Sequence, residues 1–345
     1  MDERRGSHRL RPYQGHHNGK GGACDLTEQE LASFLPRTLH ELDFSGIAGL
    51  KESRRGKVRD VLVTNENLFI ITTDRISAFD RILTTIPCKG EVLNRLSLYW
   101  FRQTEDIIRN HIVKDLTART LYVKKCSVLP VEVVVRGYLT GSAWRDYKKG
   151  RDVSGICLPQ GLAVNQAFEK PLLTPSSKEE LGTHDVPLSS ADVVKRGLID
   201  RDLWEEVCRC ALALFKRGTE VAARRGLILV DTKYEFGVAD GKLYLVDEIH
   251  TPDSSRYWFA DSYQKLFSSG EDQRKLDKEY LRGWLMERGF MGDGGPPVIP
   301  DDIRLEVARR YIQAYTIITG EEFVPKSLEP AQELSAIRQF LALAG

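Results

Sequence analysis

LILVDTKYEFGVADGKLYLVDE, residues 227–248, is the stretch that decides the fold of this chain. Two apolar runs, 227–237 and 243–248, flank a turn sequence at 238–242, so the stretch predicts a β-hairpin. Because side chains alternate along a strand, we expect Asp231, Lys233 and Glu235 on one face. Two carboxylates beside a lysine on one sheet face need a counter-charge, and a bound magnesium–nucleotide complex supplies one.

The length of the turn decides whether Asp247 joins that face. A two-residue loop, Asp240-Gly241, pairs residue 239 with residue 242 and directs Asp247 away from Glu235. A three-residue loop with a left-handed Gly241 brings Asp247 onto the face of Glu235. We expect the three-residue loop, because it assembles a metal site. The alternative is a solvent-facing hairpin with scattered charges.

The composition is that of an ordinary globular protein. The chain has 345 residues, of which 41% are hydrophobic and 29% charged, with a net charge of +1. This balance argues against a nucleic-acid-binding or membrane-surface protein, and no apolar run reaches membrane-spanning length. Six cysteines without zinc spacing are typical of free thiols in a reducing cytoplasm. We expect a cytoplasmic monomer or small homo-oligomer.

The elements around the hairpin predict an α+β protein with two lobes. We expect a disordered tail at 1–24, an antiparallel-sheet lobe at 25–130 and a larger α+β lobe at 131–345. Amphipathic periodicity predicts helices over 201–225 and 303–318, which end at Gly226 and Gly320. Prolines scattered through 148–190 predict a long irregular segment there.

Two stretches of the first lobe suit anionic substrates. Gly56-Lys57-Val58-Arg59 is a glycine-plus-basic turn that lets the backbone approach a phosphate, and its alternative is an exposed basic turn. Residues 73–80, TDRISAFD, place hydroxyls and acids just past a strand end. The alternative for this stretch is a helix start capped by Asp74 or Ser77.

Two stretches of the second lobe are also candidates. Glu132 and Arg136 share one face of an apolar strand, and Gly141-Ser142 then opens a helix whose N-terminus suits phosphate. Arg136 and Ser142 are therefore predicted to bind a phosphate together, as a clamp. The alternative is a Glu132–Arg136 ion pair with an ordinary serine cap. Residues 247–256, DEIHTPDSSR, suit a ribose, phosphate or carboxylate, and we expect His250 within them to be structural. Residues 174–178 and 183–185 are candidates for a mobile cover.

These stretches, in this order, resemble the motifs of the SAICAR synthetase family, in its longer single-function form. The chain has no Walker A sequence, dinucleotide fingerprint or protein-kinase catalytic loop. The resemblance runs from about Ser53 to Phe323. It implies a two-lobed fold related to ATP-grasp enzymes. It also implies an ATP- and Mg²⁺-dependent ligase of purine biosynthesis that joins carboxyaminoimidazole ribonucleotide (CAIR) to L-aspartate. ATP activates the ring carboxylate, the aspartate amine attacks, and phosphate leaves.

The resemblance assigns residues to each ligand by matching positions. The catalytic residues are Lys233, Glu235, Asp247 and Arg256, with Glu235 and Asp247 as metal ligands. The residues assigned to ATP are Gly56, Lys57, Arg59, Lys124, Cys126 and Glu132, with 124–129 lining the adenine. The residues assigned to CAIR and aspartate are Asp74, Ser77, Asp80, Arg136, Gly141, Ser142, Lys178, Asp185, Asp253, Ser255 and Arg256. A small-molecule kinase and a nucleotide-sensing binding module are the rival hypotheses.

Overall fold

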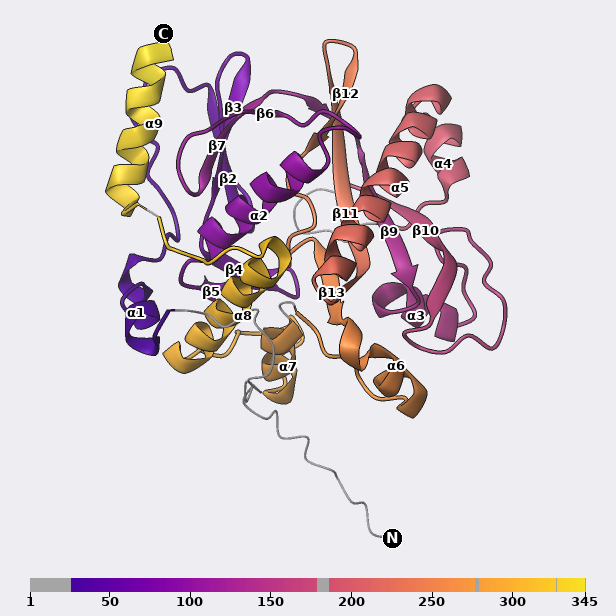
Figure 1. Ribbon diagram of the computed structural model, residues 1–345. Helices are drawn as coiled ribbons and strands as arrows, with labels where there is room; N and C mark the ends of the chain where they lie inside the picture. The colour runs from indigo at the N-terminus through magenta and orange to yellow at the C-terminus, as the bar shows by residue number, and fades with distance from the viewer. Residues whose placement is uncertain (1–25, 179–185, 277–278, 327, 345) are drawn as a thin grey trace.

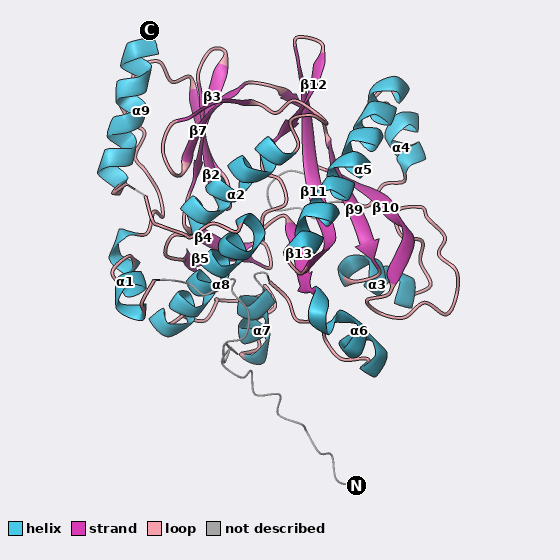
Figure 2. Ribbon diagram, viewed as in Figure 1, coloured by secondary structure: helices cyan, strands magenta, loops and turns pink. Residues whose placement is uncertain are grey.

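The computed structural model describes residues 26–178, 186–276, 279–326 and 328–344. Two antiparallel sheets stand side by side with helices around them (Figures 1 and 2). The tail expected at 1–24 and the candidate Asp185 lie outside the described residues. Within the described ranges, no helix is both long enough and apolar enough to cross a membrane.

The first sheet confirms the antiparallel N-terminal sheet predicted from the sequence. In spatial order its strands are β1 (Glu52–Arg55), β2 (Arg59–Val63), β3 (Asn67–Thr72), β7 (Thr120–Lys124) and β6 (Ile112–Asp115). It is preceded by α1 (Glu28–Ala32) and a 3₁₀ turn at Leu35–Arg37. A separate hairpin, β4 (Arg75–Ala78) and β5 (Arg81–Thr85), follows β3.

The C-terminal helix α9 (Pro330–Ala344) packs on this first sheet (Figure 1). Ile337 is fully buried against Phe69 and its apolar neighbours. Glu333 is also fully buried and accepts hydrogen bonds from the hydroxyls of Thr117 and Thr120. Residues 330–344 therefore pack with the first sheet, although the division proposed at residue 130 places them in the second lobe.

The second sheet carries the predicted hairpin at its centre. Its strands run in the order β10 (Ala167–Ser177), β9 (Val131–Tyr138), β11 (Leu227–Ala239) and β12 (Lys242–Val246), and β8 (Ser127–Val128) and β13 (Ser255–Phe259) also pair with β11. The expectation of an irregular segment over 148–190 is wrong at β10. Pro171 and Pro175 are tolerated there because β10 is an edge strand and has a register shift between Ala167 and Leu172.

The helices pack between and around the sheets. They are α2 (Lys89–Gln103), α3 (Gly141–Lys148), α4 (Ser190–Lys195), α5 (Arg201–Arg224), α6 (Ala260–Ser269), α7 (Glu279–Glu287) and α8 (Asp301–Thr319). The predicted helices α5 and α8 are confirmed. Gly226 and Gly320, just past their ends, have the left-handed backbone that helix termination favours. Apolar residues of α2, α5 and α8 share the main core.

Helix α2 begins in close contact with the end of β3. The backbone N–H of Gly90 donates to Asp74 Oδ1 at 2.8 Å. A Cβ atom on Gly90 would lie 2.3 Å from the carbonyl oxygen of Thr72 and 2.9 Å from that of Thr73. Backbone atoms cannot yield as a flexible side chain does, so only glycine fits.

We expect Gly90→Ala to lower the free energy of unfolding by about 3 kcal/mol, the cost of overpacking a tight contact. Urea denaturation measures this. The matched control is Gly283→Ala in α7, where an added Cβ meets nothing within 4 Å. That control should be neutral or stabilising by roughly 0.5–1 kcal/mol, as for glycine inside a helix. Equal stability of the two variants would contradict the steric argument.

The turn between β11 and β12 is not the one predicted. Ala239 pairs with Lys242, so the loop has two residues rather than three. Asp240 and Gly241 both have positive φ, 51° and 67°, as in the hairpin turn that Asp-Gly favours. By strand alternation alone Asp247 would then face away from Glu235. However, β12 ends at Val246 and Asp247 itself is left-handed, with φ of 63°, so the chain turns out of the strand at this residue.

Candidate active site

A row of charged side chains crosses one face of β9 and β11. Arg136 pairs with Asp231 across the strands, and Val134 pairs with Lys233. Lys233 Nζ lies 2.6 Å from Glu132 Oε1 and 3.0 Å from Glu235 Oε1. The predicted shared face is confirmed. The alternative Glu132–Arg136 ion pair is wrong, because Glu132 binds Lys233 and Arg136 binds Asp231.

One end of the row is positively charged. Arg136 donates from Nε to Thr174 Oγ1 at 2.9 Å and from Nη2 to Ser142 Oγ at 3.2 Å. Its Nη1 lies 3.3 Å from Asp231 Oδ2, while Arg256 Nε lies 3.3 Å from Asp231 Oδ1. Two guanidinium groups thus share a single carboxylate, and burial and then Arg256 lower the pKa of Arg136 despite the Asp231 carboxylate. This end keeps a surplus positive charge.

Helix α3 starts at this positive end. Gly141 has φ of +60°, a conformation that favours glycine, and a Cβ atom there would lie 2.2 Å from Arg256 Nη1 and displace the guanidinium group. Ser142 does not cap the helix, because the N-cap is Thr140, which makes no side-chain capping bond. Arg136 thus contacts Ser142, and Gly141 lies beside Arg256. Two arginines beside a helix N-terminus form an arrangement that suits a phosphate.

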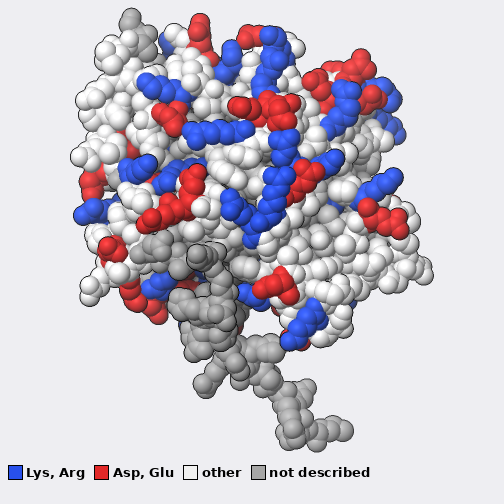
Figure 3. Space-filling model, viewed as in Figure 1, with Lys and Arg blue, Asp and Glu red and all other residues white. Residues whose placement is uncertain are grey.

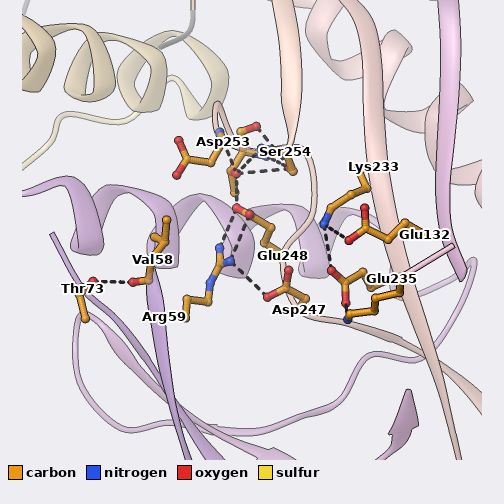
Figure 4. Close-up of polar contacts among 12 residues, drawn as sticks. Val58, Arg59, Thr73, Glu132, Lys233, Glu235, Asp247, Glu248, Asp253 and Ser254 are labelled. Atoms are coloured by element: carbon orange, nitrogen blue, oxygen red, sulfur yellow. Dashed lines mark hydrogen bonds and ion pairs between the residues drawn. The ribbon is translucent and has the colours of Figure 1, made fainter. Parts of the chain in front are cut away.

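The other end of the row is rich in carboxylates (Figure 4). Lys233 and Lys178 together outweigh the effect of burial on Glu235 and lower its pKa to about 2. Asp247 behaves in the opposite way. Burial raises its pKa, and the charges of Glu235 and Glu248 add to that effect, although Arg59 Nη1 lies only 3.2 Å away. The carboxylates of Asp247 and Glu235 therefore repel each other, even though Arg59 lies beside the first and Lys233 and Lys178 lie beside the second.

This carboxylate end fits a divalent cation that is shared with a ligand. Among the described residues, no group of three or more acidic, histidine or cysteine side chains is arranged to hold a metal alone. Mg²⁺ commonly takes only one or two protein carboxylates and completes its shell with water and phosphate oxygens. The donor set of Glu235 and Asp247 satisfies that requirement.

The Gly56–Arg59 turn approaches the carboxylate end from the first sheet. Gly56 N–H donates to Arg59 O at 2.8 Å, which closes the predicted turn between β1 and β2. Arg59 Nη2 lies 2.7 Å from Glu248 Oε2, and Lys57 Nζ lies 2.5 Å from Asp80 Oδ1. The turn thus connects the two sheets through charged contacts and keeps Lys57 at the surface.

Arg75 is a supporting residue that sequence reasoning missed. Its side chain is fully buried and ion-paired with Asp60 at 2.5 Å. It donates to the carbonyl oxygens of Gly56 at 2.9 Å and Lys57 at 3.3 Å. Arg75 therefore holds the backbone of the Gly56–Arg59 turn in place from the protein interior. The available signal was an arginine directly after Asp74, at the first position of a short strand.

The TDRISAFD stretch is a hairpin, not a capped helix start. β4 turns into β5 through Phe79 and Asp80, which both have positive φ. Asp74 is buried, and its carboxylate accepts bonds from Leu39 N, Gly90 N and Arg119 Nη1. Its assignment to substrate is therefore corrected to a structural one. Ser77 and Asp80 remain candidates.

The 247–256 loop holds a second buried ion pair. Asp253 binds the fully buried Lys89 of α2 at 2.8 Å and accepts from Tyr311 Oη at 2.5 Å. Sequence reasoning missed both contacts, because Lys89 lies in no recognisable pattern and Tyr311 was counted only as part of the periodicity that predicted α8. Ser255 is buried and donates to Thr232 Oγ1 at 2.7 Å, so its hydroxyl is structural rather than free for substrate.

The linker between the sheets, residues 125–130, contains the remaining candidates. Lys124 ends β7 and binds Asp240 of the hairpin turn at 2.9 Å. Cys126 is half-buried against Gly237, where a Cβ atom would lie 2.8 Å from the cysteine Cβ. Leu129 N–H donates to Phe236 O. The linker therefore runs along β11, on the strand that carries Glu235.

Two surface cavities, of about 370 and 440 Å³, are lined by residues outside the charged row. Acidic and basic side chains line each of them in mixture. On the face drawn in Figure 3, described acidic and basic residues are likewise interspersed. The row across β9 and β11 is therefore the strongest candidate site.

Known proteins resemble this chain in sequence and in fold. The family model for SAICAR synthetase matches residues 52–294. Phosphoribosylaminoimidazole-succinocarboxamide synthase of Bacteroides thetaiotaomicron is 47% identical over 293 residues, which cover 84% of this chain and 93% of the relative. The solved structure of SAICAR-synthase from Saccharomyces cerevisiae complexed with SAICAR is 36% identical, with a TM-score of 0.74, and the match covers 84% of this chain and 100% of that one. A type-2 SAICAR synthetase in complex with ADP is 26% identical, with a TM-score of 0.61, over 79% of this chain and 100% of that one.

Proposed function

The chain belongs to the SAICAR synthetase family, and on that premise we propose residue roles for its reaction, the ATP-dependent ligation that makes SAICAR in purine biosynthesis. The charged row across β9 and β11 carries the proposal. Its positive end suits the phosphate of a ribonucleotide, and its carboxylate end suits a metal–nucleotide complex. One sheet face thus holds both anionic substrates at a fixed spacing.

The first sheet and the linker bind ATP. Gly56, Lys57 and Arg59 cover the phosphates, because the buried Arg75 orders their turn and leaves Lys57 at the surface. Residues 124–129 line the adenine, mainly through backbone groups, and Cys126 is one of the lining residues. Glu132 acts through Lys233, which it holds at 2.6 Å. Lys233 then contacts phosphate oxygens.

Glu235 and Asp247 hold Mg²⁺. When bound, the ion neutralises phosphate charge and orients the transferring group. Burial raises the pKa of Asp247, and the charges of Glu235 and Glu248 add to that rise; a bound cation would offset both effects, which supports this role. Arg59 and Glu248 fix the position of Asp247 from the first sheet.

The nucleotide CAIR binds with its phosphate at Arg136, Ser142 and Arg256. Asp231 keeps both guanidinium groups in place, and Gly141 leaves room for Arg256. Asp253, held by Lys89, faces the same substrate. The ring carboxylate of CAIR then reaches ATP near Lys233, where phosphorylation makes it an electrophile for an amine.

L-Aspartate is the amine donor. Ser77, Asp80, Lys178 and Asp185 are the candidates for its site, and Asp185 lies outside the described residues. The described cysteines are all free, which supports a cytoplasmic enzyme. Recovery of the activity in the cytosolic fraction of a cell lysate tests that location.

A phosphate-release assay with purified protein tests the reaction. We expect phosphate release from ATP only when Mg²⁺, CAIR and L-aspartate are all present, with SAICAR formed in equal amount. A stable phosphorylated product that forms without L-aspartate would favour the small-molecule kinase instead. ATP binding without turnover at saturating substrates would favour the nucleotide-sensing module.

A further inference from the structure

The loop at 247–254 has an unusual backbone. Asp247 and His250 are both left-handed, with φ of 63° and 53°, although neither is glycine. Non-glycine residues are strained in this region, and such strain persists only where surrounding contacts impose it. The same loop carries Asp247, Glu248 and Asp253, which contact Arg59 and Lys89. Some part of the fold must therefore hold the loop in place.

His250 supplies that attachment to the sheet. Its side chain is fully buried, and Nε2 lies 2.6 Å from the hydroxyl of Tyr234 on β11. The hydroxyl of Tyr257 on β13 donates to the carbonyl oxygen of His250 at 2.7 Å. Ring Nδ1 has no hydrogen-bond partner among the described residues. A polar ring is thus kept in an apolar site by one side-chain bond and by packing.

Helices α2 and α5 pack against the ring of His250 from two further sides. The ring of Trp100 on α2 is perpendicular to that of His250, with centroids 4.6 Å apart. On α5, a Cβ atom at Gly218 would lie 2.5 Å from His250 Cε1 and 2.9 Å from Nδ1. Only glycine at 218 leaves room for the ring. Contacts from α2, α5 and β11 therefore define one position for His250.

We propose that His250 is a positioning residue for the ligase reaction, whose buried ring sets the backbone of residues 247–254 and so aims Asp247, Glu248 and Asp253 at the substrates. This inference rests on the proposed roles of Asp247 and Asp253. A histidine that only filled the core would affect stability alone. A positioning histidine also controls turnover in protein that remains fully folded.

Two variants disturb the ring without touching a substrate contact. Tyr234→Phe removes the bond to Nε2 and keeps the aromatic packing, and Gly218→Ala displaces the ring and removes no polar atom. Gly283→Ala in α7 is the matched control, because nothing lies within 4 Å of its added Cβ. Thermal melts establish the temperature at which every variant is folded, and both readouts are taken below it.

The first readout is hydrogen–deuterium exchange of peptides spanning 247–256 in the ligand-free protein. We expect exchange at least tenfold faster than wild type in Tyr234→Phe and Gly218→Ala, and unchanged in Gly283→Ala. The second readout is steady-state turnover. We expect kcat to fall roughly tenfold or more, and the magnesium concentration for half-maximal rate to rise, in the same two variants.

Wild-type exchange and wild-type kcat in the folded variants would overturn the inference. If Gly218→Ala does not fold, Tyr234→Phe decides alone. Asp247→Asn separates this inference from the proposed function. If Asp247→Asn loses activity while Tyr234→Phe keeps wild-type exchange and wild-type kcat, only the role of His250 is rejected. Full activity in Asp247→Asn would instead reject the proposed role of the loop itself.

Discussion

Glu235→Gln and Asp247→Asn are each expected to lower kcat by roughly 100-fold or more, the scale seen when one charge-stabilising group is removed from a catalytic site. Each change replaces a charged oxygen donor by a neutral amide of the same size. The proposed metal would then lose one of its protein ligands, and its hold on the ATP phosphates would weaken. Turnover at saturating substrates, followed over a range of Mg²⁺ concentrations, measures the effect.

The matched control for these variants is Asp106→Asn. Asp106 is an exposed carboxylate ion-paired with Arg217 at 2.8 Å, so its loss should leave kcat within twofold of wild type, as for other exposed ion pairs. Melting temperatures establish that all three variants are folded. Near-native turnover in both Glu235→Gln and Asp247→Asn would reject these two residues as metal ligands, whatever the turnover of Asp106→Asn.

Arg136→Lys is expected to raise the KM for CAIR by about 10- to 100-fold, with a smaller effect on kcat. A guanidinium donates in a fixed fork, and Arg136 uses three of its nitrogens on Thr174, Asp231 and Ser142. An ammonium group keeps the charge but cannot reproduce that geometry. Steady-state kinetics with CAIR as the varied substrate measures the change.

Arg217→Lys is the control for this second prediction. Arg217 also makes a forked contact, to both oxygens of Asp106 at 2.9 and 2.8 Å, but at the exposed surface. We expect an unchanged KM for CAIR in this control. An unchanged KM in Arg136→Lys as well would mean that Arg136 only supports β9, and the phosphate would have to bind elsewhere.

Periodicity and composition predicted the parts of the fold that depend on local sequence. The strand β11, the helices α5 and α8, and the antiparallel first sheet all follow from residues near one another in the chain. The family resemblance, confirmed by the comparisons, added the identity of the reaction. The shared face of Asp231, Lys233 and Glu235 also follows from alternation alone.

The missed features depend on contacts that a pattern does not encode. The β11–β12 loop was assigned one residue too many, because the position of Asp247 was attributed to register rather than to its own left-handed backbone. β10 was missed because prolines within it were taken as breaks, yet an edge strand has N–H positions that no neighbour needs. Lys89 is buried only because a loop 164 residues later supplies Asp253.

The packing of α9 on the first sheet affects the order in which parts of the newly synthesised chain can fold. Ribosomes release residues in order, so β2 and β3 emerge long before Ile337 and Phe340, which complete their apolar cover. Until the final helix is made, Phe69 lacks its contacts with Ile337 and Phe340, and Thr120 lacks its hydrogen bond to Glu333. The first sheet is synthesised early, but its apolar cover is therefore complete only once residues 330–344 have been made.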